Sequence, residues 1–251
     1  MAGVDIKKIQ NKLLEMAKKI AFILEEHDIP YMIAFGTLLG AIRHNGFIPW
    51  DDDFDFYLFD ETYDRAIEYL RAELPEDMFL EDEKSEPLYF HSWAHVKDVN
   101  SITSCTEFPQ DSLYTHKGIS VDLYRTKKMK LSELEAFLND ENEAYINRRL
   151  KNKLITTDEY NERIRKLNER RTFIKENPET RDDYVYNLVP VYKCHYMNNE
   201  DIFPLKKYKF ENNEFLGPNN AEIILTMIYG DYMKLPPLEK RVCHYSTVEF
   251  N

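Results

Sequence analysis

The sequence predicts an α/β fold in which helices flank a mixed sheet and a charged helical insertion interrupts the second half. Strand-like and helix-like segments alternate through the first half of the chain, which is typical of the α/β class. Residues 131–176 contain no glycine or proline and many charged residues, which indicates a helical insertion. We therefore expect 1–130 and 177–251 to form the main domain, with 131–176 appended to it.

The composition limits the classes of protein to consider. The chain has 251 residues, 43% of them hydrophobic, and is long enough to bury a large core. Its formal net charge of −12 argues against binding to nucleic acid, which relies on many Lys and Arg side chains. No apolar run approaches the roughly 18 residues of a membrane span. We expect a cytoplasmic protein, with peripheral contact at the inner face of the membrane as an option.

The three cysteines, Cys105, Cys194 and Cys243, are too few and too scattered for a disulfide framework, which indicates a reducing compartment. Cys194 and Cys243 are each followed by a histidine, His195 and His244. Such adjacent pairs lack the spaced-loop geometry of zinc sites, so we expect buried or idle thiols instead.

The first elements follow from periodicity. Apolar residues at three- and four-residue spacing predict an amphipathic helix from Asp5 to about His27. A short apolar run at 31–35 predicts a strand, and residues 61–74 show a second helical pattern. Further strand-like segments lie at 78–80, 88–96, 102–108 and 119–124.

The first strand ends at Gly36 and Thr37, where a glycine lets backbone N–H groups approach a ligand closely. One or two helical turns are expected from Thr37 to His44, and a helix N-terminus attracts anions. Arg43 and His44 close this segment. The pattern predicts a phosphate-binding turn formed by Gly36, Thr37, Arg43 and His44.

Four acids, Asp51, Asp52, Asp53 and Asp55, lie within five residues after that turn. Side chains alternate along a strand, so Asp53 and Asp55 would share one face and converge. Like charges about 5 Å apart repel by roughly 3 kcal/mol at an effective dielectric near 20. We therefore predict a bound cation. A solvated acidic turn is the common alternative, but the apolar residues on both sides of the run disfavour it.

One later residue is a further candidate for a phosphate contact. Lys97 follows the segment 88–96, where His91 and His95 would share a face if the strand is regular. A contact between Lys97 and a donor phosphate is one interpretation, and a structural role is the other.

The stretch GTLLGAIRHNGFIPWDDDFD at 36–55 resembles the signature of the LicD family, which includes the fukutin-related phosphotransferases. Weaker matches lie at 95–103, 118–124, 203–211 and 229–237. The resemblance implies a nucleotidyltransferase-like sheet and Mg²⁺ or Mn²⁺ held by Asp53, Asp55 and Asp122. It also implies transfer of a phospho-alcohol, most familiarly phosphocholine, from a CDP-linked donor to a hydroxyl of a glycan or lipid-linked glycan.

The resemblance leaves several alternatives open. The general base is Asp122, Asp51 or Asp52, and the sequence does not choose between them. The same fold also suits an enzyme that moves the nucleoside monophosphate itself, or a silent module that binds a nucleotide or carbohydrate. Lys127 stands where the family commonly has a second aspartate after its third-acid strand, which leaves the head group of the donor open.

Two long helices fit the insertion, separated near 156–158, with Thr157 as the expected cap of the second. Between Arg148 and Lys175 there are ten basic residues and four acidic ones, the reverse of the whole chain. A solvated helical face is the usual explanation. The alternative is a surface for an anionic glycan, a lipid-linked acceptor or a membrane headgroup.

The last part of the chain shows three local patterns. A hairpin is expected around Asn212 and Asn213. Asn219 followed by Glu222 resembles a capping box that opens a helix, and Gly230 would end that helix. In the tail, Arg241 and His244 are candidates to reach the site.

Overall fold

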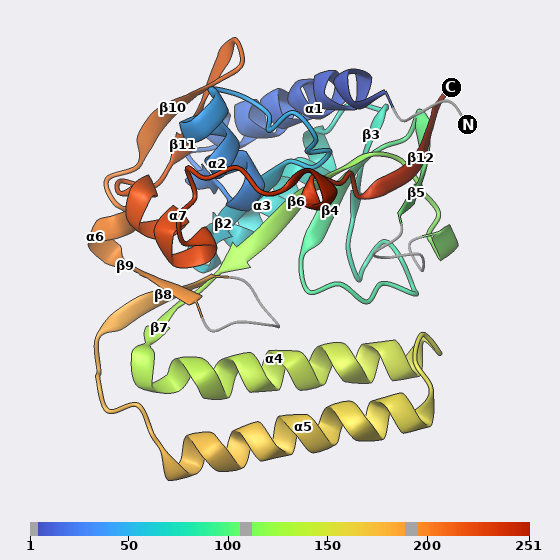
Figure 1. The fold of residues 1–251 in the computed structure, drawn as a ribbon. Coiled ribbons are helices and arrows are strands. Elements are labelled where there is room, and N and C mark those ends of the chain that lie inside the picture. The colour runs from blue at the N-terminus through green and yellow to red at the C-terminus, as the bar shows by residue number, and fades with distance from the viewer. Residues whose placement is uncertain (1–4, 106–111, 189–194) are drawn as a thin grey trace.

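The computed structural model describes residues 5–105, 112–188 and 195–251, and the α/β fold is confirmed (Figure 1). A five-stranded sheet has the order β1-β2-β6-β4-β3. The strands β2 and β6 are parallel, whereas the other neighbours are antiparallel, so the sheet is mixed. Its strands are β1 Tyr31–Ile33, β2 Asp55–Phe59, β3 Met78–Glu81, β4 Ala94–Asp98 and β6 Ser120–Thr126.

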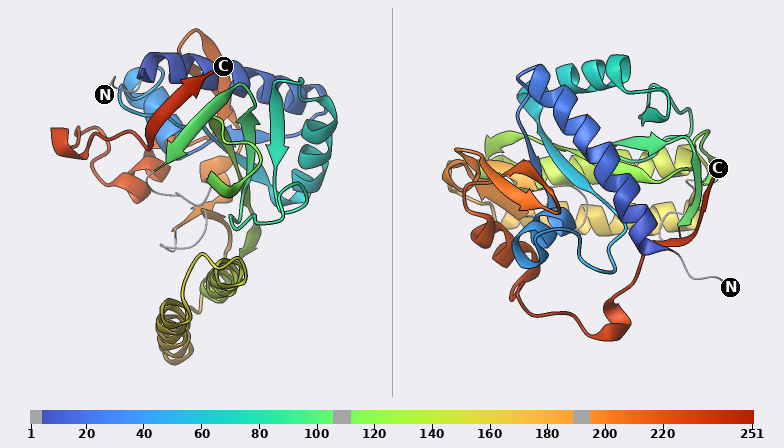
Figure 2. Two further views of the ribbon diagram at one scale, coloured as in Figure 1. Left: turned by 90° about the vertical axis from the view of Figure 1, so that its right-hand side faces the viewer. Right: turned by 90° about the horizontal axis from the view of Figure 1, so that it is seen from above.

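Two long helices pack against this sheet. Helix α1, Ile6–Glu26, crosses the sheet and contacts both β6 and helix α3, Asp60–Glu73 (Figure 2). The predicted apolar stripe of α1 is confirmed, with Ile9, Leu13 and Leu24 fully buried. Each such side chain contributes about 1.5–3 kcal/mol to stability when it is removed from water. Packing of the first helix therefore holds the sheet that carries the acids.

The smaller β-structures surround the sheet. A hairpin of β10 and β11 has the register Phe210↔Asn213, so its turn residues are Glu211 and Asn212, one position earlier than predicted. The C-terminal strand β12 pairs with β5, and β7, β8 and β9 form a third small sheet. These strands are β5 Ser101–Cys105, β7 Lys128–Lys130, β8 Tyr184–Leu188, β9 His195–Asn198, β10 Lys206–Phe210, β11 Asn213–Gly217 and β12 Tyr245–Phe250.

The predicted helices of the insertion are confirmed as α4, Leu131–Lys151, and α5, Thr157–Glu176, which lie side by side below the main body (Figure 1). The cap of α5 is Thr156 and not Thr157. Its hydroxyl accepts the N–H of Glu159, and the Glu159 carboxylate accepts the Thr156 N–H, which completes a capping box.

The expected strand at 88–96 is wrong in its first part, since β4 begins only at Ala94. Tyr89, Phe90 and His91 are buried, but their rings pack against Tyr114 and Tyr145 instead of forming a strand. These residues therefore show the apolar pattern of a strand because they are buried, although their backbone is not part of the sheet. The strand expected at 102–108 is β5, Ser101–Cys105, and its last three expected residues lie outside the described part of the chain.

Three short helices complete the fold: α6 Asn199–Ile202, α7 Ala221–Tyr229 and the 3₁₀ helix η2 Leu238–Lys240. Gly230 ends α7 with a positive φ of 69°, as predicted. The predicted capping box at Asn219 is wrong, because Asn220 is the N-cap and its side chain bonds Asp201 instead of the helix backbone. None of the described helices has the length and apolar composition needed to cross a bilayer.

Candidate active site

The strands β2 and β6 bring the predicted acids together. Asp55 and Asp122 are paired in register across the two parallel strands. The N–H of Asp55 donates to the hydroxyl oxygen of Thr37 at 2.9 Å, which ties the start of β2 to helix α2, Phe35–His44. Phe54 and Phe56 point into the core and are fully buried, so the expected division of faces is confirmed.

Helix α2 begins at Phe35, two residues before the predicted start. Ala34 is extended and Phe35 has a φ of 38°, so the chain turns before it reaches Gly36. A Cβ atom on Gly36 would lie 2.7 Å from an Asp51 oxygen and 3.7 Å from an Asp53 oxygen. Glycine is therefore needed here because the two carboxylates press against the first turn of α2. The predicted phosphate contact of Gly36 and Thr37 stays a prediction.

A third group joins Asp51 and Asp53. Asp51, Asp53 and His244 each offer one possible ligand atom. These three atoms lie within 4.8 Å of one another, a spacing suited to a metal ion. His244 Nδ1 bonds Asp52 at 2.8 Å and lies 3.6 Å from Asp53. The metal-ligand set predicted from sequence was Asp53, Asp55 and Asp122. The structure brings Asp51, a predicted candidate base, and His244, a predicted candidate to reach the site, to the same region.

Asp52 has a different environment from the other acids. It is fully buried and accepts hydrogen bonds from the Cys243 thiol, the His244 ring and the backbone N–H groups of His244 and Tyr245. Burial favours the neutral carboxyl group, but these hydrogen bonds outweigh it and lower the pKa of Asp52 below its usual value. Asp52 thus anchors the C-terminal segment, a role that the sequence did not reveal.

Burial and mutual repulsion disfavour ionisation of the remaining acids. Burial, followed by the charge of Asp53, raises the pKa of Asp51 to about 8 and that of Asp122 to about 7. The same causes raise the pKa of Asp55 well above its usual value. The hydrogen bond to Asp52 raises the pKa of His244 to about 9 despite its burial. A cation at this site would remove the repulsion, and the carboxylate oxygens of these acids suit Mg²⁺ or Mn²⁺.

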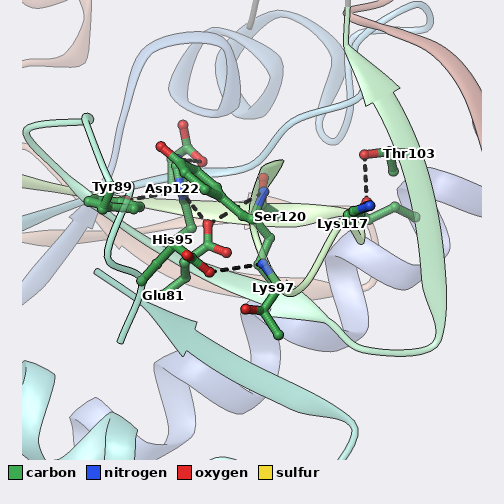
Figure 3. Close-up of polar contacts among 12 residues, drawn as sticks. Glu81, Tyr89, His95, Lys97, Thr103, Lys117, Ser120 and Asp122 are labelled. Atoms are coloured by element: carbon green, nitrogen blue, oxygen red, sulfur yellow. Dashed lines mark hydrogen bonds and ion pairs between the residues drawn. The ribbon is translucent and has the colours of Figure 1, made fainter. Parts of the chain in front are cut away.

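A buried polar network supports Asp122 from behind (Figure 3). Trp93 Nε1 and the Tyr124 hydroxyl both donate to one Asp122 oxygen, at 3.0 and 3.1 Å. The other Asp122 oxygen lies 3.5 Å from Nε2 of His95, whose Nδ1 lies 3.4 Å from Glu81. These contacts limit the positions that the Asp122 carboxylate can take.

Lys97 belongs to this network. Its side chain is buried and its ammonium lies 3.9 Å from the Glu81 carboxylate (Figure 3). In the register of β4 with β6, Lys97 is opposite Ser120, and His95 is opposite Asp122. The structure therefore supplies a charge partner for Lys97 within the protein, and its contact with a donor phosphate stays a prediction.

The remaining predicted residues hold the edges of the site. Arg43 donates to the Tyr232 carbonyl at 2.7 Å and to the His44 ring at 3.0 Å, so α2 is tied to the segment after α7. Arg241 lies over the ring of Trp50, 4.9 Å from its centroid. Lys127 is exposed, and its Nζ lies 5.5 Å from the centroid of the Phe137 ring of α4, so this side chain faces the insertion.

Helix α1 also contributes to the site. The buried side chain of Gln10 donates to the carbonyls of Ile48 and Asp51 at 3.0 and 2.9 Å. These bonds fix the turn that carries Asp51. The available sequence signal for this contact was a glutamine beside the apolar residues of an amphipathic helix. Its partners lie about forty residues later in the sequence, and helical periodicity relates only residues within one helix.

Of the cysteine–histidine pairs, Cys194 lies outside the described residues, whereas Cys243 and His244 both bind Asp52. The basic residues of the insertion have partners as well. Arg170 and Arg171 pair with the acids Glu135, Asp140 and Glu143 of α4, while Arg148 and Arg149 contact the 88–93 loop or the Tyr145 ring. These contacts favour helix packing over a free basic surface for these four arginines.

Comparison with known proteins agrees with the motif. Residues 28–99 match the family model described as LicD/FKTN/FKRP, nucleotidyltransferase domain. The chain is 28% identical to the lipopolysaccharide cholinephosphotransferase LicD of Haemophilus influenzae over 262 aligned residues, which cover 98% of this chain and 97% of that protein. An uncharacterized protein of Rickettsia prowazekii is 26% identical over 50% of this chain and 48% of its own length. The residues that carry the acid motif therefore resemble the nucleotidyltransferase domain of the LicD family, and the similarity to the Haemophilus protein extends along nearly the whole chain.

Proposed function

We propose that this protein is a metal-dependent transferase that moves a phospho-alcohol, phosphocholine or a close analogue, from a CDP-linked donor to a hydroxyl of a cell-surface glycan precursor. One observation carries the proposal. Asp51, Asp53, Asp55 and Asp122 converge beside the first turn of α2 in a chain that is similar, along its length, to a lipopolysaccharide cholinephosphotransferase. The acceptor would be a glycan or a lipid-linked glycan.

Asp53, Asp55 and Asp122 would hold Mg²⁺ or Mn²⁺, with Asp51 close to the same position. When bound, such a metal neutralises charge on the donor diphosphate, which is the main requirement of phosphoryl transfer. The raised pKa values of Asp51, Asp55 and Asp122 support this assignment, since the cations of the protein near Asp51 and Asp122 do not offset burial and the charge of Asp53.

The chain's own residues would orient the substrates. The N-terminal turn of α2, with Gly36 and Thr37, faces the acids and would bind phosphate oxygens through backbone N–H groups. Arg43, at the other end of α2, would contribute positive charge, whereas burial and the charge of Arg43 lower the pKa of His44, so its neutral ring would orient Arg43. Arg43 already donates to the Tyr232 carbonyl and to the His44 ring, so its remaining N–H groups would contact the donor.

The acceptor oxygen would attack the phosphorus that carries the alcohol, and the bond from that phosphorus to the CMP oxygen would break. CMP would leave, and the acceptor proton would pass to a carboxylate. Of the three candidate bases, Asp52 accepts four hydrogen bonds from residues 243–245. This leaves Asp51 and Asp122 for the proton.

Identification of the products tests the proposal. The protein is incubated with Mg²⁺, CDP-choline or another CDP-alcohol, and a panel of sugar acceptors. The expected products are CMP and an acceptor that carries the phospho-alcohol, detected by mass spectrometry. An acceptor that carries cytidine monophosphate would show the runner-up reaction, transfer of the nucleotide. Binding of CDP-alcohols without any turnover would indicate a silent binding module.

A further inference from the structure

The segment 233–242 exposes an unusual amount of apolar surface. Met233, Leu235, Leu238 and Val242 are 58%, 45%, 75% and 63% exposed. They are four of the twelve large hydrophobic side chains that are exposed in the described part of the chain, and they lie within ten residues. Single exposed apolar residues are normal on protein surfaces, but a concentration of this kind marks an interaction site.

This segment projects from the body of the molecule, yet both of its ends are fixed (Figure 2). On one side, Arg43 holds the carbonyl of Tyr232. On the other, Asp52 holds Cys243, His244 and Tyr245. Between them, two prolines restrict the backbone and η2 forms one short turn. The apolar side chains are therefore held outward by the structure, so little ordering is needed when they bind a partner.

The charge of the segment indicates the kind of partner. Lys234, Lys240 and Arg241 outweigh the one acid, Glu239, which gives a local net charge of +2 in a chain of net charge −12. Lys234 and Lys240 are exposed beside the apolar side chains. Positive charge next to exposed Leu and Met is the combination that binds the interface of an anionic bilayer. The screening length of about 8 Å at physiological salt limits repulsion from acids elsewhere in the chain.

We propose that the 233–242 segment docks this protein on the surface of an anionic lipid bilayer. Leu238 and its apolar neighbours would enter the headgroup region while Lys234 and Lys240 contact lipid phosphates. Because the ends of the segment are held by Arg43 and Asp52, docking places the acid cluster close to the membrane. This proposal does not depend on the reaction that the site catalyses.

The test is co-sedimentation of the full chain, without any donor, with vesicles of phosphatidylcholine alone or mixed with phosphatidylglycerol. Wild-type protein is expected to bind the mixed vesicles and to be released by salt. Leu238→Asp should weaken binding by about tenfold or more. The double variant Lys234→Gln and Lys240→Gln should weaken it by about fivefold for each removed charge. Leu238 is mostly exposed, so its variant should keep the melting temperature within about 2 °C.

Phe173 on α5 supplies the matched control, since it is 64% exposed but lies on the insertion. Phe173→Asp should bind the mixed vesicles like wild-type protein. Equal loss in Phe173→Asp and Leu238→Asp would overturn the assignment, and so would unchanged binding in Leu238→Asp. Light scattering without lipid provides the other decisive readout: a wild-type dimer that Leu238→Asp dissociates, with no vesicle binding, would make the segment an interface between two copies.

Discussion

Asp55 and Asp122 lie directly opposite each other on neighbouring parallel strands, β2 and β6. Paired residues in such strands point to the same face of the sheet, so the register sets the two carboxylates side by side. The two residues are more than sixty positions apart in the sequence. The site therefore depends on this one strand pairing more than on any single motif.

Asp55→Asn should abolish the metal-dependent binding of the donor. Wild-type protein with Mg²⁺ and CDP at about a hundredfold excess over Kd should melt roughly 5–10 °C higher than without ligand. The variant should lose this shift while its melting temperature without ligand is maintained or raised, because one repelling charge has been removed. Thermal shift with CDP, in Mg²⁺ and in excess chelator, measures both effects.

Asp60→Asn is the matched control, since Asp60 follows β2 at its other end and pairs with Arg125. It should retain the shift produced by Mg²⁺ and CDP. A CDP shift in wild-type protein that persists in chelator would contradict the metal assignment. A large loss of stability in ligand-free Asp55→Asn would instead favour a structural role for this carboxylate.

The stability of the metal-free protein should fall as the pH rises from about 5 to 9. Asp51 and Asp122 have pKa values raised to about 8 and 7, so between about pH 4 and 8 the folded chain holds protons that the unfolded chain has released. His244 acts in the same direction, because its pKa is raised to about 9 and its stabilising contribution is lost as the pH passes that value. Melting curves in chelator across this range measure the trend.

Mg²⁺ should oppose this trend, with its largest stabilising effect at the alkaline end, where the carboxylates are ionised. In chelator, Asp55→Asn should make the melting temperature depend less on pH, since the variant lacks one of the acids that repel one another. If the stability of the metal-free protein rises with pH instead, the pKa values of these carboxyl groups are not raised in the folded protein.

Asp52→Asn should release the C-terminal segment. An amide has one acceptor oxygen in place of two, so some of the four donors from residues 243–245 lose their partner. We expect the free energy of unfolding to fall by about 2–4 kcal/mol. Burial and the bond to Asp52 raise the pKa of the Cys243 thiol to about 12 in the wild type. Its reaction with a thiol reagent should therefore be slow, and the variant should react faster.

The thiol experiment is done with Cys105 and Cys194 replaced by serine, so that Cys243 alone reports. Asp60→Asn in the same background should leave the labelling rate unchanged. Equal labelling rates in Asp52→Asn and its parent would mean that the tail stays docked without this carboxylate.

Glu81→Gln should weaken metal binding without large changes in the fold. Glu81 contacts both His95 and Lys97 below Asp122, so the amide should loosen the orientation of the Asp122 carboxylate. Loss of such supporting contacts typically costs about 10–100-fold in metal affinity. Titration with Mn²⁺, followed by electron paramagnetic resonance, measures the affinity. If Glu81→Gln has a lower melting temperature but the same Mn²⁺ affinity, the contacts of Glu81 stabilise the fold and do not orient the metal ligand.

Local patterns in the sequence predicted the elements that depend on neighbouring residues. Helix α1 and the faces of β2 follow from three-to-four-residue and two-residue periods. The family resemblance implied a third acid on a later apolar strand, and Asp122 was the candidate of that kind. The start of α2 was placed two residues late because Phe35, and not Gly36, takes the positive φ. Sequence rules assign such angles to glycine first.

Long-range contacts were beyond these patterns. Nothing near Asp52 in the sequence distinguishes it from Asp51 or Asp53, yet its partners, Cys243 to Tyr245, lie about 190 residues later. The 88–93 loop resembled a strand because its aromatic residues are buried against Tyr114 and Tyr145. Arg170 and Arg171 resembled part of a free basic face because their acidic partners are on the other helix.

The distance along the chain between Asp52 and Cys243, 191 residues, has a consequence for synthesis. At about 5–20 residues per second, roughly 10–40 s pass on the ribosome between the appearance of the carboxylate and that of its donors. During that interval the sheet can form, but Asp52 lacks its four hydrogen bonds from residues 243–245. The nascent protein should therefore acquire its mature site only after residue 245 has left the exit tunnel.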